Sequence, residues 1–255
     1  MISILLDTSV LVFCYATLWF AVSILLRRND IADIAWGLGY LAISLFLVVT
    51  RPASGISLLI LVLIAIWAIR LSGHIFLRNR KKTEDFRYRK WREEWGRNWI
   101  WRSFLQVFLL QGFFMLVISA PILVASHDHF AHPGVFAWLG TAVWMIGFFF
   151  QAVGDYQLAR FIKTRKDREA VLRTGLWRYS RHPNYFGEIL MWWGLFLIVL
   201  PLPYGWMAAV SPLTITWLLA FVSGVPMLEK RYENNPAYQA YKKRTNALFP
   251  WKPGN

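Results

Sequence analysis

The sequence contains little charge for its length. Only 16% of the 255 residues are charged, whereas soluble domains carry roughly 25%. The apolar share is correspondingly high at 57%, and the chain has 15 tryptophans and 19 phenylalanines. One soluble core would not need so many large aromatic side chains, whereas a bundle embedded in a bilayer uses them as belts and packing surface. The composition therefore excludes an ordinary soluble domain and indicates a membrane protein.

Cysteine is almost absent, since Cys14 is the only one. This excludes an intramolecular disulfide and a metal site built from thiolates. Cys14 lies inside an apolar run, where we interpret it as a small apolar side chain. That run ends in Arg27 and Arg28 rather than at a small-residue cleavage site. We therefore expect it to be a true membrane span and not a signal peptide.

Acidic residues are also scarce, 14 against 28 lysines and arginines, which gives a net charge of +14. Such a charge can indicate nucleic-acid binding. Here the cations lie in short segments between long apolar runs, and no basic module stands apart from them. We therefore expect no nucleic-acid partner.

Long apolar runs define the fold. Seven of them can cross roughly 30 Å of hydrocarbon, near residues 4–26, 31–50, 56–77, 103–125, 135–159, 184–200 and 206–223. With the N-terminus outside, 27 of the 28 lysines and arginines fall on the cytoplasmic side, and only Arg51 does not. This bias predicts an all-α polytopic membrane bundle of about seven spans with a cytoplasmic C-terminus.

A loop-to-helix motif carries most of the polar chemistry, Gly175-Leu-Trp-Arg-Tyr-Ser-Arg-His-Pro-Asn-Tyr-Phe-Gly-Glu188. Pro183 suits a first helical turn, whose free N–H groups attract anions. Asn184 and Glu188 are four residues apart and share one helix face. A carboxylate one turn inside a span is costly and usually functional. The motif predicts a phosphate-bearing ligand, and the structural alternative is a helix cap with snorkelling cations.

Two neighbouring segments extend this pattern. Gln151 and Asp155 share a face near the cytoplasmic end of the fifth span. Asp155 either pairs with a loop arginine or accepts hydrogen bonds from a ribose or an amide. In the tail, Tyr238 and Tyr241 suit a short interfacial helix whose rings meet the bilayer. Alternatively the tail is a flap over an anionic cofactor. The side chains that would reach its phosphates are Lys243, Arg244 and Asn246.

The second and third spans carry a further set of polar residues. Asp33 lies on one face of the second span, and Arg70 and His74 are four residues apart on the third. An Asp33–Arg70 pair would neutralise both charges, and this structural role competes with a catalytic one. A histidine at such a place can donate a proton or polarise a carbonyl.

Two other patterns have simpler interpretations. The segment 78–102 mixes many cations with Trp91, Trp95, Trp99 and Trp101, which is typical of a stretch at the headgroup level. A short outer loop holds three histidines and an aspartate but has no partner elsewhere on that face, so we expect no metal site. These residues are His127, Asp128, His129 and His132.

The motifs resemble the C-terminal domain of the membrane steroid 5-alpha-reductase superfamily. They are Asp155-Tyr, the 175–188 segment and Arg244-Thr-Asn-Ala-Leu-Phe-Pro250. With Asp30-Ile-Ala-Asp-Ile-Ala-Trp-Gly-Leu-Gly-Tyr40 and Glu84-Asp-Phe-Arg-Tyr88, the whole chain resembles the bacterial DUF1295 branch of that superfamily.

The resemblance implies NADPH bound by a C-terminal three-span region, 135–255, and a lipid or steroid-like substrate bound by an N-terminal four-span region, 1–134, within one integrated membrane domain. It also implies location in a bacterial inner membrane. The expected cofactor-binding residues are Asp155, Arg173, Arg178, Tyr179, Arg181, His182, Asn184, Tyr185, Glu188, Lys243, Arg244 and Asn246.

We therefore predict a membrane reductase that uses NADPH to reduce an activated carbon–carbon double bond in a lipid, steroid-like or isoprenoid substrate. The catalytic residues would be Arg70 or His74, with Asp33 orienting them. One alternative is a methyltransferase of the isoprenylcysteine carboxyl type, which shares an Arg-His-Pro-x-Tyr-x-Gly motif and binds S-adenosylmethionine. Another is a lipid-binding protein without enzymatic activity.

Overall fold

The computed structural model describes residues 1–80, 82–167 and 169–254, and these fold into helices joined by turns and loops. They form two compact units. Unit 1 comprises residues 1–133 and 201–210, and unit 2 comprises residues 134–200 and 211–255. The fold is therefore all-α, as the sequence predicts.

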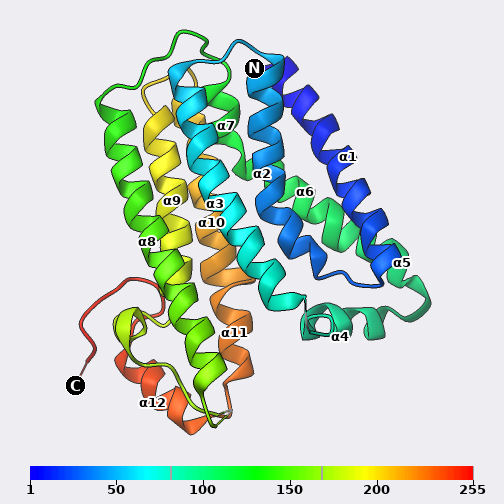
Figure 1. Cartoon of the computed structure of the whole chain (residues 1–255), viewed down its shortest axis with the longest axis vertical. Helices are drawn as coiled ribbons and strands as arrows, with labels where there is room; N and C mark the ends of the chain where they lie inside the picture. Colours follow the sequence, from blue (N-terminus) through cyan, green and yellow to red (C-terminus); the bar gives the residue numbers. More distant parts are fainter. Residues whose placement is uncertain (81, 168, 255) are drawn as a thin grey trace. The chain divides into compact units, whose positions relative to one another are not determined.

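Unit 1 contains three long helices followed by a broken one (Figure 1). The long helices are α1 (Ile2–Leu26), α2 (Ile31–Thr50) and α3 (Gly55–Asn79). The broken helix consists of α4 (Phe86–Trp95), η1 (Gly96–Asn98), α5 (Trp99–Ser103), the π-helical η2 (Phe104–Leu109), α6 (Leu110–Ile118) and α7 (Ala120–Ala125). The short 3₁₀ helix η4 (Gly205–Ala209) also belongs to this unit.

Large side chains and buried hydrogen bonds hold α2 against its neighbours. The rings of Tyr40 on α2 and Trp67 on α3 meet edge to face with centroids 5.6 Å apart. The hydroxyl of Ser72 donates to the Ile34 carbonyl at 2.8 Å, and that of Tyr15 donates to the Ala35 carbonyl at 2.7 Å. Hydrogen bonds of this kind join helices in hydrocarbon, where water is not available to either partner.

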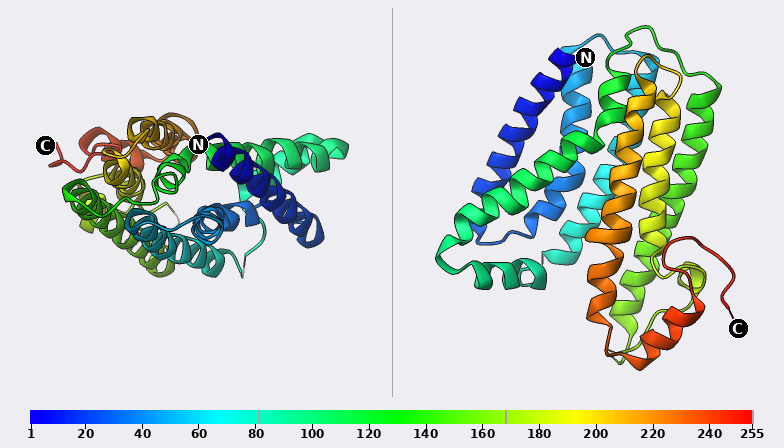
Figure 2. Two further views of the ribbon diagram at one scale, coloured as in Figure 1. Left: turned by 90° about the horizontal axis from the view of Figure 1, so that it is seen from above. Right: turned by 180° about the vertical axis from the view of Figure 1, so that it is seen from behind.

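Helix α4 lies across the ends of the long helices of unit 1 (Figure 2). Its N-cap is Asp85, whose carboxylate accepts from the Arg87 backbone N–H at 3.0 Å. Trp91 and Trp95 pack on the buried cluster of α1, α2 and η2, to which Tyr88 belongs. Those two indoles therefore face the core of unit 1, and the position of this segment at the headgroup level stays a prediction.

Unit 2 contains the long helix α8 (Val135–Thr164) and, antiparallel to it, α9 (Pro183–Val199) (Figure 1). Its remaining elements are η3 (Gly175–Arg178), α10 (Val210–Trp217), the π-helical η5 (Leu218–Val222), α11 (Val225–Arg231) and α12 (Pro236–Arg244).

Glycines spaced seven residues apart bring α8 and α9 into backbone contact. A Cβ on Gly187 would lie 2.4 Å from the Gln151 nitrogen, and one on Gly194 would lie 2.6 Å from the Gly140 oxygen. Small residues permit such close approach of membrane helices, which are stabilised by packing rather than by exclusion of water. This contact fixes the polar residues at the ends of α8 and α9 relative to each other.

Six helical segments within the described part of the chain are long and apolar enough to cross a membrane. The seventh predicted span is α9, whose 17 residues extend about 25 Å at 1.5 Å per residue. The protein is therefore an integral membrane helical bundle of about seven spans. Its orientation and the membrane in which it resides stay predictions.

Candidate functional site

The predicted loop-to-helix motif forms one end of unit 2. Gly175 has a φ of +63° and a Cβ there would meet the side chain of Gln157, so both conformation and space favour glycine. Gln157 accepts a hydrogen bond from the Leu176 N–H at 3.0 Å. The indole of Trp177 donates to the Gly154 carbonyl at 3.1 Å. These contacts attach the loop to α8 directly before α9 begins.

Glu188 lies on the buried face of α9, with only 6% of its surface exposed. The Trp192 indole donates to Oε1 at 2.9 Å, and the Gln151 amide donates to Oε2. Both donors are neutral. The carboxylate is therefore oriented by α8 and by its own helix, as expected for a side chain with a defined task inside a span.

Asn184 joins the first turn of α9 to Asp155 on α8. Its Nδ2 donates to Asp155 Oδ1 at 3.0 Å. Its own Oδ1 is buried and has no hydrogen-bond partner among residues 1–80, 82–167 and 169–254. A buried amide oxygen without a donor costs free energy. The structure thus brings together Asp155, Asn184 and Glu188, and one acceptor there can still receive a hydrogen bond from a ligand.

Arg181 is buried and its guanidinium is already engaged. Nε and Nη2 contact Glu229 Oε1 at 2.8 and 2.7 Å, and Nη1 donates to the Lys242 carbonyl at 3.2 Å and to the Thr245 carbonyl. The ammonium of Lys242 lies 2.7 Å from the other Glu229 oxygen. Arg181 therefore anchors the tail in this structure, a role that the prediction of a cofactor contact did not include.

His182 belongs to the same buried cluster. Its Nε2 lies 3.4 Å from Glu229 Oε1, and its ring stacks on Tyr185 with centroids 5.4 Å apart. Burial lowers the pKa of the His182 imidazole, although the hydrogen bond with Glu229 opposes this shift. The neutral form is therefore favoured at the N-cap of α9.

The tail pairs with the loop through its backbone. The N–H groups of Arg181 and His182 donate to the carbonyls of Asn246 and Ala247 at 2.9 and 3.0 Å. The Trp251 N–H donates to the Tyr179 carbonyl at 3.0 Å. The tail thus covers the loop that precedes α9, which agrees with the flap alternative in position, while its contact with a cofactor stays a prediction.

The tyrosines of α12 lie inside unit 2. Tyr238 and Tyr241 are 7% and 5% exposed, and the Tyr241 hydroxyl donates to the Trp177 carbonyl. Burial raises the pKa of Tyr241. The expectation that these two rings meet the bilayer is wrong, because hydrogen bonding and packing against the 177–181 loop bury them.

The remaining predicted cations of unit 2 are exposed. Arg173 donates to the Ala237 carbonyl at 2.9 Å, and the Arg178 guanidinium lies 5.8 Å from the centre of the Tyr179 ring. Lys243, Arg244 and Asn246 are also exposed. Exposed cations can attract phosphates without first breaking a buried ion pair.

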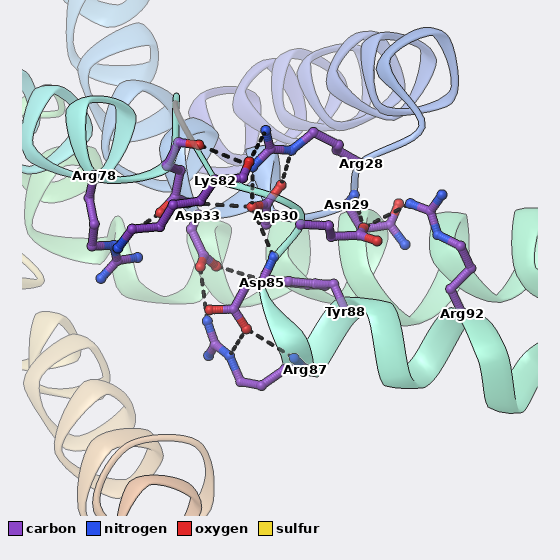
Figure 3. A network of polar contacts seen from close by, with 12 residues as sticks. Arg28, Asn29, Asp30, Asp33, Arg78, Lys82, Asp85, Arg87, Tyr88 and Arg92 are labelled. Atoms are coloured by element: carbon purple, nitrogen blue, oxygen red, sulfur yellow. Dashed lines mark hydrogen bonds and ion pairs between the residues drawn. The ribbon is translucent and has the colours of Figure 1, made fainter. Parts of the chain in front are cut away.

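In unit 1, Asp33 is held by two residues of α4 (Figure 3). The Arg87 guanidinium lies 3.0 Å from Oδ2, and the Tyr88 hydroxyl donates to Oδ1 at 2.6 Å. Arg87 also contacts Asp85 at 2.9 Å. Burial raises the pKa of Asp85, but the hydrogen bonds and charge of Arg87 more than offset this, and the net pKa is lowered.

The sequence does not identify the partners of Asp33, because a charge inside a span is expected to pair with a residue of a neighbouring span. Arg87 and Tyr88 lie instead in the 84–88 segment, for which the sequence indicates only a resemblance to a family pattern. Arg70 and His74 are half-buried on α3, and their catalytic role stays a prediction.

A second set of contacts fixes the start of α2 (Figure 3). Arg28 forms a bidentate pair with Asp30 at 2.8 and 3.0 Å, and this hydrogen bonding raises the pKa of Arg28. Glu84 accepts from the Asn29 N–H at 2.6 Å and from Arg92 at 2.8 Å. In this cluster each carboxylate faces a guanidinium, so its charges are balanced internally.

The histidines of the 127–132 loop do not assemble a metal site. No group of three or more His, Cys, Asp or Glu side chains suited to a metal occurs in the part of the chain that the structure describes. His129 Nδ1 lies 3.1 Å from the Pro52 carbonyl, and the His127 ring meets Tyr204.

Comparison with known proteins identifies the family. Residues 19–245 match the family described as "Protein of unknown function (DUF1295)", and the chain belongs to it. An uncharacterized protein of Schizosaccharomyces pombe, C594.04c, is 24% identical over 216 residues, which cover 72% of this chain and 60% of that protein. The match thus spans less than two thirds of the relative. No solved structure shows significant similarity to the chain.

Proposed function

We propose that the protein is a membrane reductase that binds NADPH in unit 2 and reduces an activated carbon–carbon double bond in a lipid, steroid-like or isoprenoid substrate. The resemblance to membrane steroid reductases supports the reaction class. The membrane fold supports a lipid substrate, since such a substrate reaches the protein from the bilayer.

The observation that carries the proposal is the state of the amide oxygen of Asn184. Its Oδ1 is buried without a donor inside the described chain, while its Nδ2 is fixed by Asp155. NADPH carries ribose hydroxyls and a carboxamide, and each offers a donor for such an oxygen. A pyrophosphate and a 2′-phosphate match the exposed cations Arg178, Lys243 and Arg244. The donor and acceptor set of unit 2 therefore fits NADPH.

Each group of the site has a separate task in this proposal. Asp155 fixes the amide of Asn184, so that its oxygen points to one donor on the ligand. Glu188 is preoriented by Gln151 and Trp192 and accepts a second hydrogen bond. NADPH supplies the hydride when bound, while the protein supplies orientation and exclusion of water.

A hydrogen-bond donor must also polarise the carbonyl conjugated with the double bond, because negative charge develops on that oxygen. We retain Arg70 and His74 as the proposed donors. Asp33 is already balanced by Arg87. We therefore assign Asp33 a structural task in unit 1 rather than a direct one.

Cofactor binding to protein purified in detergent tests the proposal. Thermal unfolding should shift upward with NADPH, since a ligand present at 100 times its Kd stabilises by about 2.7 kcal/mol. Asn184→Ala should weaken NADPH at least tenfold, which corresponds to about 1.4 kcal/mol. Asn98→Ala is the matched control, because Asn98 is exposed in η1 and caps no helix through its side chain.

Two comparisons separate the alternatives. NADH lacks the 2′-phosphate, so a preference for NADPH that disappears in Lys243→Ala/Arg244→Ala would assign those cations to that phosphate. S-adenosylmethionine carries a sulfonium and no phosphate, and an exposed basic rim repels it. Stabilisation by S-adenosylmethionine without stabilisation by NADPH would reject the reductase in favour of the methyltransferase.

A further inference from the structure

Three pairs of exposed apolar side chains, each followed in the sequence by an exposed cation, lie at one end of unit 1. Two of the pairs end helices, whereas the third lies in α5, which continues into η2 and α6. The three sets are Leu25-Leu26-Arg27 at the end of α1, Phe76-Leu77-Arg78 at the end of α3 and Ile100-Trp101-Arg102 in α5. The six apolar side chains are between 43% and 82% exposed.

Polar contacts within unit 1 link the segments that carry these three sets. Arg28, next to the first set, donates to the carbonyls of Asn79 and Lys82 at 3.4 and 3.1 Å. The Asn29 amide donates to the Ser103 hydroxyl at 2.7 Å, which ties the same turn to the third set. The three sets of residues therefore lie at the same end of unit 1.

The acidic residues at this end do not neutralise that surface. Asp30, Asp33, Glu84 and Asp85 contact guanidinium groups inside the cluster of Figure 3. The exposed acids among the described residues of 78–102 are Glu93 and Glu94, and the latter lies 3.7 Å from Lys90. The exposed cations at this end are Arg27, Arg78, Arg80, Lys82, Arg89, Lys90, Arg97 and Arg102.

The two faces of helix α4 differ, since one is aromatic and packs inward and the other is basic and exposed. Tyr88, Trp91 and Trp95 face the core of unit 1, whereas Arg89 and Lys90 are exposed. The helix lies across the ends of the spans (Figure 2), as a helix at the membrane surface does. Its exposed cations add to the positive charge that Arg27, Arg78 and Arg102 place at this end of unit 1.

We propose that this end of unit 1 is a docking surface for anionic phospholipids. At the ends of α1 and α3 the exposed apolar pairs contact acyl chains, and the cation that follows each pair contacts the headgroup phosphate. In α5 the chain enters the span, so Arg102 contacts a phosphate while Ile100 and Trp101 lie at the interface before it. An anionic headgroup complements the excess of exposed cations better than a zwitterionic one, whose own ammonium is repelled. The surface includes none of the residues of unit 2 that are assigned to the cofactor.

Titration of delipidated protein in detergent with phosphatidylglycerol tests this proposal, with bound lipids counted by native mass spectrometry. Phosphatidylcholine with the same acyl chains is the neutral comparison, and glycerol 3-phosphate tests the headgroup alone. The wild type should bind phosphatidylglycerol at least tenfold more tightly than phosphatidylcholine. Raising the salt from 0.1 to about 0.5 M should reduce that preference, because the cations are exposed to solvent.

Variants locate the surface. Arg27→Gln/Arg78→Gln/Arg102→Gln should lower the preference at least threefold, and the corresponding triple lysine variant should keep it. The matched control is Arg160→Gln/Lys166→Gln/Lys230→Gln, which removes three exposed cations that follow no pair of exposed large apolar residues. An equal affinity of the wild type for both lipids, or an equal loss in the control, would overturn the proposal. If the glutamine variant fails to fold, a preference in the wild type that does not change with salt would overturn it.

Discussion

The two units bury their charges to different extents. In unit 2, the side chains of Arg181 and Glu229 are each only 9% exposed. In unit 1, Arg87 remains 29% exposed while it contacts Asp33 and Asp85, which are 19% and 23% exposed. Water therefore screens the Arg87 pairs of unit 1 more strongly than the Arg181–Glu229 pair of unit 2.

The helices of the units also approach each other in different ways. In unit 2, α8 and α9 meet through glycines, backbone to backbone. In unit 1, α2 and α3 meet through large rings such as those of Tyr40 and Trp67, and the backbone atom nearest to a Cβ on Gly37 is farther away, at 3.3 Å. Backbone contact leaves less room for adjustment than contact between side chains. Unit 2 is the more preorganised, which suits a site that must hold Asn184 and Glu188 in place.

Removal of one guanidinium from each unit tests the difference in burial. Arg181→Met should destabilise by about 3–5 kcal/mol, because it leaves Glu229 without its buried partner. Arg87→Met should cost about 1–3 kcal/mol, since water can still reach Asp33 and Asp85. Thermal unfolding in detergent measures both. Equal losses would show that the two ion-pair clusters are equally shielded.

Alanine at matched glycines tests the difference in packing. Gly187→Ala should destabilise by about 1–3 kcal/mol, because its Cβ would overlap backbone atoms of α8. Gly73→Ala on α3 should change the unfolding temperature little or raise it slightly, because no atom lies within 4 Å of its Cβ. A large loss at Gly73 would show that α3 is packed as closely at that position as α9 is at Gly187.

As the pH falls, unit 2 should lose stability at a higher pH than unit 1. The pKa of His182 is lowered in the folded state, so its contribution is complete above the ordinary value of about 6.5 and decreases as the pH falls below it. The pKa of Asp85 is also lowered, and its contribution is lost only below about 3.9. Unfolding temperatures measured from pH 7.5 to 5 should fall for the wild type and fall less for His182→Gln. Identical pH profiles would disprove the role of His182.

The smallest effect is expected in the 127–132 loop of unit 1. Replacing His127, His129 and His132 together by alanine should leave the Kd for NADPH unchanged, because these side chains assemble no metal site. The measurement is the same thermal titration used for Asn184→Ala. A tenfold loss, about 1.4 kcal/mol, would reveal a site that the geometry does not show.

The helices could be predicted from the sequence because hydrocarbon requires about 20 apolar residues for each crossing. The pairing of α8 with α9 could also have been recognised, since Gly140, Gly147 and Gly154 recur every seven residues. The Asp33–Tyr88 contact could not, because its residues are 55 positions apart and belong to no common helix face.

The orientation of aromatic residues was harder to predict. The sequence of α4 places Tyr88, Trp91 and Trp95 along one side of a polar helix but does not identify what that side packs against, and the structure shows that it packs on the core of unit 1. Tyr238 and Tyr241 were misplaced for a related reason, since a basic helix with tyrosines fits either an interface or a loop that covers it.

The backbone pairing between the tail and the Arg181–His182 loop has a consequence for biosynthesis. The acceptors of those two N–H groups are Asn246 and Ala247, which a ribosome adds roughly 65 residues after the loop itself. At about 5–20 residues per second, some 3–13 s pass between the synthesis of the loop and the synthesis of these two tail residues. During this interval α9 can insert, but the segment before it has no tail to cover it. The N-terminal unit is therefore translated, and can be folded, before the proposed cofactor site is complete.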